Sequence, residues 1–149
     1  WKLVMRRVNV TQLCHELILD YYDVLEEAQY EVAIQVDDMP VYAYSDEEAV
    51  KRILKNMIDN AVRHGGSGKY LGIRLKYLAD GIRIEVEDHG AGITAKDEEQ
   101  IFSRNYTTAR KGTGSGLGLT IARNLARQMG ADIKVYSEPG IRTVFALIL

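Results

Sequence analysis

Hydrophobic and polar residues follow one another along the chain with two different spacings. Apolar residues recur every three or four positions over residues 11–28, 46–65 and 117–129, which predicts helices with one buried face each. Residues 31–36 alternate apolar and polar side chains, as a half-buried strand does. The chain is therefore expected to begin with a helix and a strand, and a longer helix follows.

Cap residues indicate where the helices begin and end. Asn9 or Thr11 can cap the first helix, and Ser45, which precedes three acidic residues, is predicted to cap the second. The glycine-rich residues 65–68 are expected to end the second helix, and Gly130 the third. Each predicted helix thus has a start or stop signal of its own.

Two pairs of strands complete the pattern. Residues 70–78 and 82–88 flank a turn signal and predict a hairpin. Residues 132–136 and 143–149 are predicted to form a second antiparallel pair. Strands in hairpins with interspersed helices predict an α+β fold, a two-layer sandwich in which three helices cover one face of a mixed, mostly antiparallel sheet.

Length and composition favour one domain over residues 1–149. With 149 residues, 46% of them hydrophobic, the chain can bury its own core. Its 19 lysines and arginines against 21 acidic residues give a net charge of -2, so no nucleic-acid partner is expected. One cysteine, Cys14, favours a reducing compartment and excludes an internal disulfide. The sequence shows neither a spanning apolar run nor a signal peptide, so no membrane contact is expected.

The second helix carries the first candidate functional residues. One quadrant of the helical wheel, at the edge of the apolar face, holds Asn56, Asn60, Arg63 and His64. A single asparagine on a helix is often only solvated, but two of them one turn apart, followed by Arg63, favour a binding site. Carboxamide oxygens can complete the ligand shell of Mg²⁺ once a nucleotide supplies the negative charge.

A carboxylate is predicted on the apolar side of the strand over residues 82–88. Because successive side chains of a strand point to opposite faces, Asp88 is expected on the same face as Ile84 and Val86. Burying it unpaired would be costly, so Asp88 is expected to have a dedicated donor, and the exocyclic amine of adenine would serve. The alternative is that Asp88 only caps the turn at Gly90.

The segment before the third helix is long and rich in glycine. Residues 90–115 exceed the usual loop length of about 4 to 6 residues, which favours a functional or mobile segment. Residues 112–118 lead straight into the helix, where free backbone N–H groups and the helix dipole attract phosphate. The run lacks the closing Lys-Ser or Lys-Thr of a P-loop and the glycine spacing of a dinucleotide fold.

Four segments in this order resemble the boxes of a sensor histidine kinase. They are NMIDNAVRH (56–64) for the N box, DHGAG (88–92) for the first glycine box, IFSR (101–104) for the F box and GSGLGL (114–119) for the second glycine box. The resemblance covers residues 8–149 and extends to the superfamily of gyrase, heat-shock chaperone, histidine kinase and MutL ATPases. It implies a Bergerat-type fold that binds ATP and Mg²⁺ beneath a mobile lid.

The resemblance also implies roles for individual residues. Asn56 and Asn60 would serve Mg²⁺ and phosphate, with Asn60 at the strongest metal position, and Arg63 would complete the catalytic group. Asp88 would bind the adenine amine, and Thr143 would line the adenine pocket. The residues implied to contact ATP are Asn56, Asn60, Arg63, His64, Asp88, Gly90, Gly92, Ile93, Arg104, Lys111, Gly114, Ser115, Gly116, Leu117, Gly118, Leu119 and Thr143.

Two departures from the family pattern lie in this region. His89 stands where the family commonly has asparagine, and Asn105-Tyr106 replaces the usual aromatic residue after Arg104. Arg104, Arg110 and Lys111 could equally reach the phosphates or be solvated charges of the lid.

The implied function is transfer of the ATP γ-phosphate to a histidine on a separate dimerisation domain, expected upstream of Trp1. The other partner would be a response regulator, and the expected location is the cytoplasm, as the cytosolic part of a membrane-bound bacterial sensor. His15 is not expected to be the acceptor, because the proline of the acceptor motif is missing after Leu17. The isolated domain is therefore not expected to phosphorylate itself.

Two alternatives stay open from the sequence. A superfamily ATPase or serine kinase would carry a glutamate base at the position of Asn56, and a carboxamide cannot accept a proton, which argues against both. A nucleotide-binding signalling scaffold without catalysis would keep the same pocket.

Overall fold

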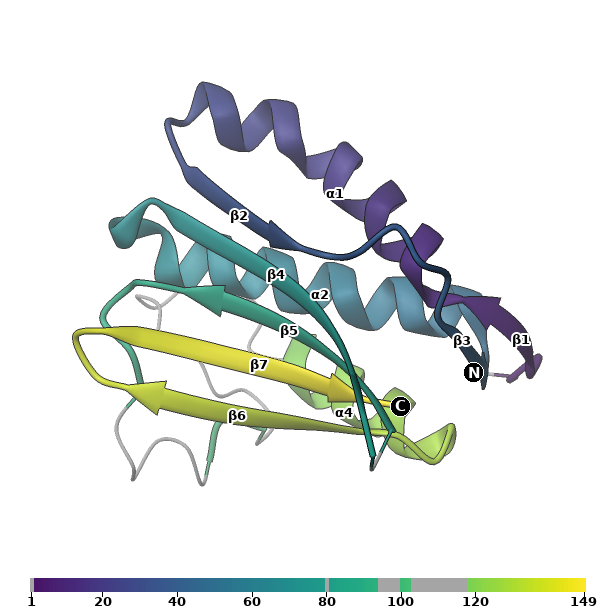
Figure 1. Ribbon diagram of the computed structural model, residues 1–149. Helices are drawn as coiled ribbons and strands as arrows, with labels where there is room; N and C mark the ends of the chain where they lie inside the picture. Colours follow the sequence, from purple (N-terminus) through teal and green to yellow (C-terminus); the bar gives the residue numbers. More distant parts are fainter. Residues whose placement is uncertain (1, 80, 94–99, 103–117) are drawn as a thin grey trace.

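The computed structural model describes residues 2–79, 81–93, 100–102 and 118–149. The helices lie on one side of a five-stranded sheet, and a short two-stranded sheet lies near the N-terminus (Figure 1). In chain order the elements are β1 (Arg6–Asn9), α1 (Val10–Glu27), β2 (Glu31–Gln35), β3 (Tyr42–Ser45), α2 (Glu47–Gly65), the 3-10 turn η1 (Gly66–Gly68), β4 (Tyr70–Leu78), β5 (Gly81–Asp88), α4 (Gly118–Gln128), β6 (Asp132–Glu138) and β7 (Arg142–Ile148).

The large sheet has the strand order β2-β4-β5-β7-β6. β2 runs parallel to β4, and the other neighbouring pairs are antiparallel. The small sheet is the antiparallel pair of β1 and β3. The predicted α+β sandwich with a mixed, mostly antiparallel sheet is confirmed.

The helices and the sheet share one hydrophobic core. The apolar positions predicted for the buried face of α2 are all at most 2% exposed: Val50, Ile53, Leu54, Met57, Ile58 and Ala61. They belong to the same cluster as Val86 of β5 and Phe145 of β7. Burying a side chain of this kind contributes about 1.5–3 kcal/mol. This face therefore fixes α2, with its candidate residues, against the sheet.

One of the two predicted caps is wrong. Asn9 caps α1 as expected, since its Oδ1 accepts a hydrogen bond from the backbone N–H of Gln12 at 3.0 Å. α2 is capped by Asp46 and not by Ser45, because the Asp46 Oδ1 accepts from the backbone N–H of Ala49 at 3.0 Å. Ser45 instead ends β3 and pairs with β1. Neither of these strands is predicted from the sequence, since four residues give too short an alternation.

Candidate nucleotide site

Asp88 ends β5 on the side of the sheet that faces the helices. It is 5% exposed, and the strand register places it between Leu71 of β4 and Thr143 of β7. Its Oδ1 accepts a hydrogen bond from the backbone N–H of Gly90 at 3.0 Å. Burial raises the pKa of the Asp88 carboxyl, and the hydrogen bond from Gly90 offsets this only in part. The carboxylate is thus buried on the apolar side, as predicted, and it also holds the turn.

The segment after Asp88 is fastened to the hairpin of β6 and β7. The backbone N–H of Ile93 donates to the Oγ of Ser137 at 2.8 Å. The same Oγ lies 3.0 Å from the Oγ1 of Thr143, which is 3% exposed. Two predicted site residues are therefore linked through a serine that no motif in the sequence singles out.

Gly92 takes a position that only glycine can hold. Its φ is +84°, and a Cβ at Gly92 would lie 2.8 Å from the Cα of Pro139. Beside it, the backbone N–H of Gly140 donates to the carbonyl of Ala91 at 2.9 Å. Gly90 is buried. The glycines of the first glycine box thus allow two turns to pack closely beside Asp88.

The predicted residues of the N box lie near the end of α2. Asn56 and Asn60 are half-buried and one helical turn apart, and neither carboxamide has a hydrogen-bond partner among the described residues. Arg63 is exposed. His64 is half-buried, and its Nδ1 has no partner in the described part of the chain. Burial, together with the charge of Arg63, lowers the pKa of His64, which favours the neutral imidazole.

The end of α2 meets the turn after β5. A Cβ on Gly68 would lie 1.9 Å from the carbonyl oxygen of His89, so the backbone of η1 packs directly on the residue after Asp88. Tyr30 lies at the same junction, with its hydroxyl 2.8 Å from the Cβ position of Gly66. Burial and then the charge of Asp88 raise the pKa of Tyr30. The N-box helix and Asp88 are therefore brought together, with Tyr30 as a neighbour that the sequence does not reveal.

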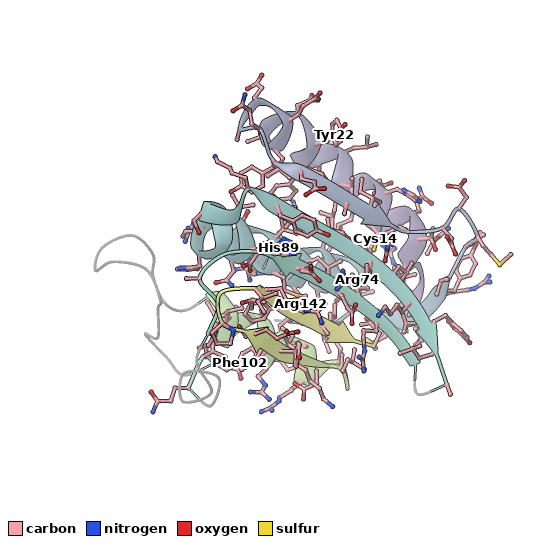
Figure 2. The ribbon with its side chains drawn as sticks, turned by 60° about the vertical axis from the view of Figure 1, so that its left-hand side comes forward. Cys14, Tyr22, Arg74, His89, Phe102 and Arg142 are labelled. Atoms are coloured by element: carbon pink, nitrogen blue, oxygen red, sulfur yellow. The ribbon has the colours of Figure 1, made fainter. Side chains whose placement is uncertain are left out.

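The described part of the F box packs on the first turn of α4. The Oγ1 of Thr120 donates to the carbonyl of Phe102 at 2.7 Å, and the guanidinium of Arg123 lies 4.2 Å from the centre of the Phe102 ring. Phe102 is labelled in Figure 2. Gly118 begins α4, and Leu119 packs against the core. The candidate residues outside the described residues are Arg104, Arg110, Lys111, Gly114, Ser115, Gly116 and Leu117.

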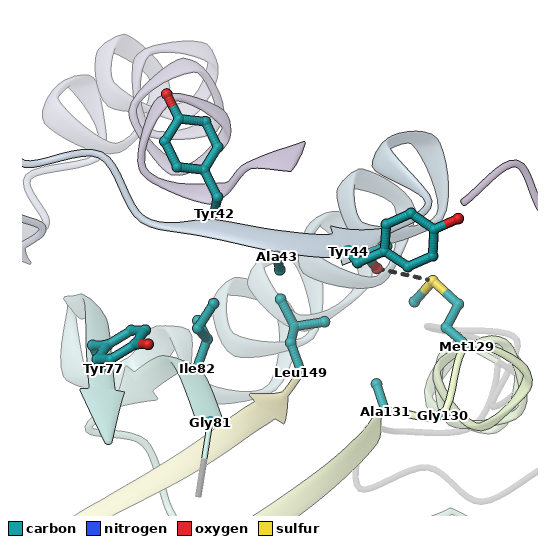
Figure 3. Close-up of a pocket in the computed structure, with 11 residues that line it drawn as sticks. Tyr42, Ala43, Tyr44, Tyr77, Gly81, Ile82, Met129, Gly130, Ala131 and Leu149 are labelled. Carbon is teal, nitrogen blue, oxygen red and sulfur yellow. Dashed lines mark hydrogen bonds between the residues drawn. The ribbon is translucent and has the colours of Figure 1, made fainter. Parts of the chain in front are cut away.

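A hollow of about 260 Å³ lies at the other end of the sheet, where β5 begins (Figure 3). The Oγ of Ser45 lies 3.4 Å from the Sδ of Met129 at its wall. No predicted site residue lines it, so it is separate from the candidate nucleotide site. Its larger lining side chains are Tyr42, Tyr44, Tyr77, Ile82, Met129 and Leu149.

Two features are absent from the part of the chain that the structure describes. It contains no group of three or more histidine, cysteine or acidic side chains that could hold a metal ion. None of its helices is both long and apolar enough to cross a membrane.

Residues 45–149 match the family described as Histidine kinase-, DNA gyrase B-, and HSP90-like ATPase. The chain belongs to this ATPase family. The matched part begins just before α2 and contains Asp88, Thr143 and all four boxes. The predicted site residues thus all lie within the part of the chain that matches the family.

Within this ATPase family, the chain resembles sensor histidine kinases over nearly its whole length. It is 40% identical over 152 residues to sensor histidine kinase YcbM of Bacillus subtilis. The alignment covers 99% of this chain and 49% of that protein. It is 31% identical over 139 residues to sensor histidine kinase WalK of the same species, covering 89% of this chain and 23% of that protein. The chain therefore spans about half the length of the first relative and less than a quarter of the second. The predicted resemblance is confirmed.

Solved structures confirm the fold. The catalytic domain of histidine kinase ThkA matches with a TM-score of 0.84 at 22% identity, over 97% of this chain and 94% of that one. Full-length ShkA, which was solved in complex with AMPPNP, also gives a TM-score of 0.84, at 26% identity, over 99% of this chain and 31% of that one. The ATPase-family domain described here therefore has the fold of a histidine kinase catalytic domain.

Proposed function

We propose that this chain binds ATP with Mg²⁺ and presents the γ-phosphate for transfer to a histidine on a separate dimerisation domain. Residues 1–149 act as one catalytic and ATP-binding domain of a two-component sensor kinase, and a response regulator is the next acceptor. The observation that carries the proposal is the junction of α2 with β5. There Gly68 packs on the backbone of His89 and brings the N box to the buried Asp88.

Asp88 holds the base in this proposal. Its Oδ1 is engaged by Gly90, whereas its Oδ2 has no hydrogen-bond partner among the described residues. The Oδ2 is therefore the acceptor for the exocyclic amine of adenine. Guanine carries a carbonyl oxygen at the equivalent position, which would face the carboxylate as a second acceptor, so the site favours adenine. Thr143, on the neighbouring strand, lines the same pocket.

The donor set of α2 fits Mg²⁺. This cation prefers oxygen ligands, keeps several waters and relies on substrate phosphates for charge. The carboxamides of Asn56 and Asn60 supply such oxygens, with Asn60 as the main ligand, and Arg63 adds positive charge beside the phosphates. When bound with ATP, Mg²⁺ neutralises phosphate charge. The further proposed ATP contacts are His64, Gly90, Gly92, Ile93, Arg104, Lys111, Gly114, Ser115, Gly116, Leu117, Gly118 and Leu119.

Asn56 favours phosphoryl transfer to histidine over hydrolysis. Phosphoryl transfer depends on positioning and charge neutralisation, and an acceptor imidazole brings its own nucleophile. Activation of water or a hydroxyl needs a base, and a carboxamide cannot act as one. The half-buried amide of Asn56 therefore suits a kinase for histidine.

The proposal is tested by transfer of labelled phosphate from ATP to a separately supplied dimerisation domain that carries an acceptor histidine. We expect the wild-type chain to label that domain, and Asp88→Asn and Asn60→Ala to reduce labelling strongly. Asp59→Asn, on an exposed position of α2, is the matched control and should label like wild type. Nucleotide binding without transfer would favour the signalling scaffold. Absence of both would overturn the proposal.

A further inference from the structure

A network of charged side chains covers β4 and β5 on the face of the sheet opposite the helices. Glu85 is 7% exposed and Glu87 is 5% exposed, although both point away from the hydrophobic core. The guanidinium of Arg74, a residue labelled in Figure 2, joins them. Its Nε lies 2.8 Å from the Oε1 of Glu85 and its Nη2 3.0 Å from the Oε1 of Glu87. His89 ends the network, with its Nε2 2.6 Å from the Oε2 of Glu87.

The face of the His89 ring makes a stacking contact with Tyr70. The ring of Tyr70 stacks on it with 3.7 Å between centroids and an interplanar angle of 2°. Tyr70 can lie over the sheet because Gly72 has no side chain. A Cβ at Gly72 would lie 3.1 Å from the Tyr70 hydroxyl oxygen and 3.2 Å from its Cε1. Glu87 at the edge of the imidazole and Tyr70 on its face together fix the orientation of His89.

The backbone of His89 belongs to the candidate nucleotide site. It joins Asp88 to Gly90, and its carbonyl meets η1 at Gly68. A ring held on its face and at its edge restricts the rotation of the His89 side chain, and this in turn restricts the backbone from which its Cα–Cβ bond extends. Contacts on the far face of the sheet therefore constrain the backbone that carries the Asp88 carboxylate.

We propose that His89 is a positioning residue for adenine recognition. Its clamp between Tyr70 and Glu87 holds the turn after β5 so that Asp88 presents its second oxygen to the base. This inference rests on the proposed function, because it takes Asp88 as the group that binds adenine. The contacts of Arg74 with Glu85 and Glu87 do not involve the imidazole. Loss of the imidazole is therefore expected to loosen the turn more than the sheet.

Three variants separate the two contacts of the imidazole. His89→Phe keeps a ring that can stack on Tyr70 and removes the bond to Glu87. His89→Gln keeps an N–H donor and removes the stack, and His89→Ala removes both. If the loosened turn is competent for binding about one-fifth of the time, the apparent Kd of ADP rises about fivefold.

The experiment is titration calorimetry of the whole chain with ADP, with thermal unfolding measured in parallel. We expect about fivefold weaker binding for His89→Ala, partial rescue by His89→Phe and His89→Gln, and little change in Tm. The control is Lys76→Ala, which removes a lysine 3.2 Å from Glu85 in the same network but away from the turn. This control should bind ADP like wild type.

The outcomes distinguish the inference from the proposed function. A wild-type chain that does not bind ADP would overturn both. Wild-type binding with equal affinity in His89→Ala would overturn the positioning role alone, and so would an equal loss in Lys76→Ala, because the network would then act through general stability. If His89→Ala does not fold, wild-type affinity in both His89→Phe and His89→Gln would overturn it.

Discussion

Replacing Asp88 with asparagine tests whether the Asp88 carboxylate binds the adenine amine. The substitution keeps the shape of a side chain that is 5% exposed and exchanges one acceptor for a donor. In the proposed complex the two oxygens of Asp88 serve two donors, the backbone N–H of Gly90 at 3.0 Å and the adenine amine. Asparagine has one acceptor oxygen. Whichever way its amide turns, its NH₂ group faces another donor.

The expected loss of affinity follows from that mismatch. A hydrogen bond to a charged group contributes about 1.5–3 kcal/mol, so Asp88→Asn should raise the Kd of ADP roughly 10- to 150-fold. Stability should not fall with affinity. Because burial raises the folded-state pKa of Asp88, the ionised carboxyl costs stability once the pH has risen through that pKa. The neutral amide removes this cost, so the Tm should equal or exceed that of wild type.

The assay combines titration calorimetry with ADP and thermal unfolding at neutral pH. Asp59→Asn is the matched control, since Asp59 is exposed on α2 and accepts a hydrogen bond from the hydroxyl of Tyr21 at 2.9 Å. It should bind ADP like wild type. Unchanged affinity in Asp88→Asn would leave Asp88 as a turn residue only. A parallel fall in affinity and Tm would mean that the substitution acts through the fold.

Three further measurements address the metal, the charged network and the core. Asn60→Ala should lose more ATP affinity with Mg²⁺ than without it, because its oxygen is the proposed metal ligand; equal losses in the two titrations would contradict that role. Burial alone would raise the pKa of Glu87, but hydrogen bonds from His89 and Arg74 outweigh it and hold the pKa below its ordinary value of 4.5. Its contribution to stability is thus complete above 4.5 and lost as the pH falls through the lowered pKa, so acid unfolding curves of Glu87→Gln should show a weaker pH dependence than wild type. Met57→Ala, at a position with 0% exposure, should cost about 2–5 kcal/mol in urea unfolding, and a cost below about 1 kcal/mol would show that α2 is not fixed by this face.

The sequence predicts the parts of this fold that depend on periodicity. The buried face of α2 and the inward position of Asp88 each follow from spacing alone, because a helix or strand fixes which residues share a face. The cap of α2 does not. Ser45 and Asp46 are both good cap residues, and the choice depends on a partner 42 positions away, the backbone N–H of Val4, which donates to the Asp46 Oδ2 at 2.8 Å.

Two residues near the candidate site are missed for the same reason. Tyr30 and Ser137 follow no motif, and their roles arise from packing between distant segments. The hydroxyl of Tyr30 reaches η1, and the Oγ of Ser137 joins Ile93 to Thr143. Local patterns carry no information about such contacts, since the partners lie far apart along the chain.

β5 carries a buried carboxylate on each of its two faces. Its alternation places Asp88 toward the helices and Glu87 on the opposite face, yet the structure buries both carboxylates. Glu87 is paired with Arg74 and His89, so its pKa is lowered. Among the described residues Asp88 accepts a hydrogen bond only from the Gly90 N–H, and burial raises its pKa. A buried carboxylate with few donors is costly until a ligand supplies one. The paired face holds the strand that ends in Asp88, and in the proposed complex this keeps the Asp88 carboxylate in place for the adenine amine.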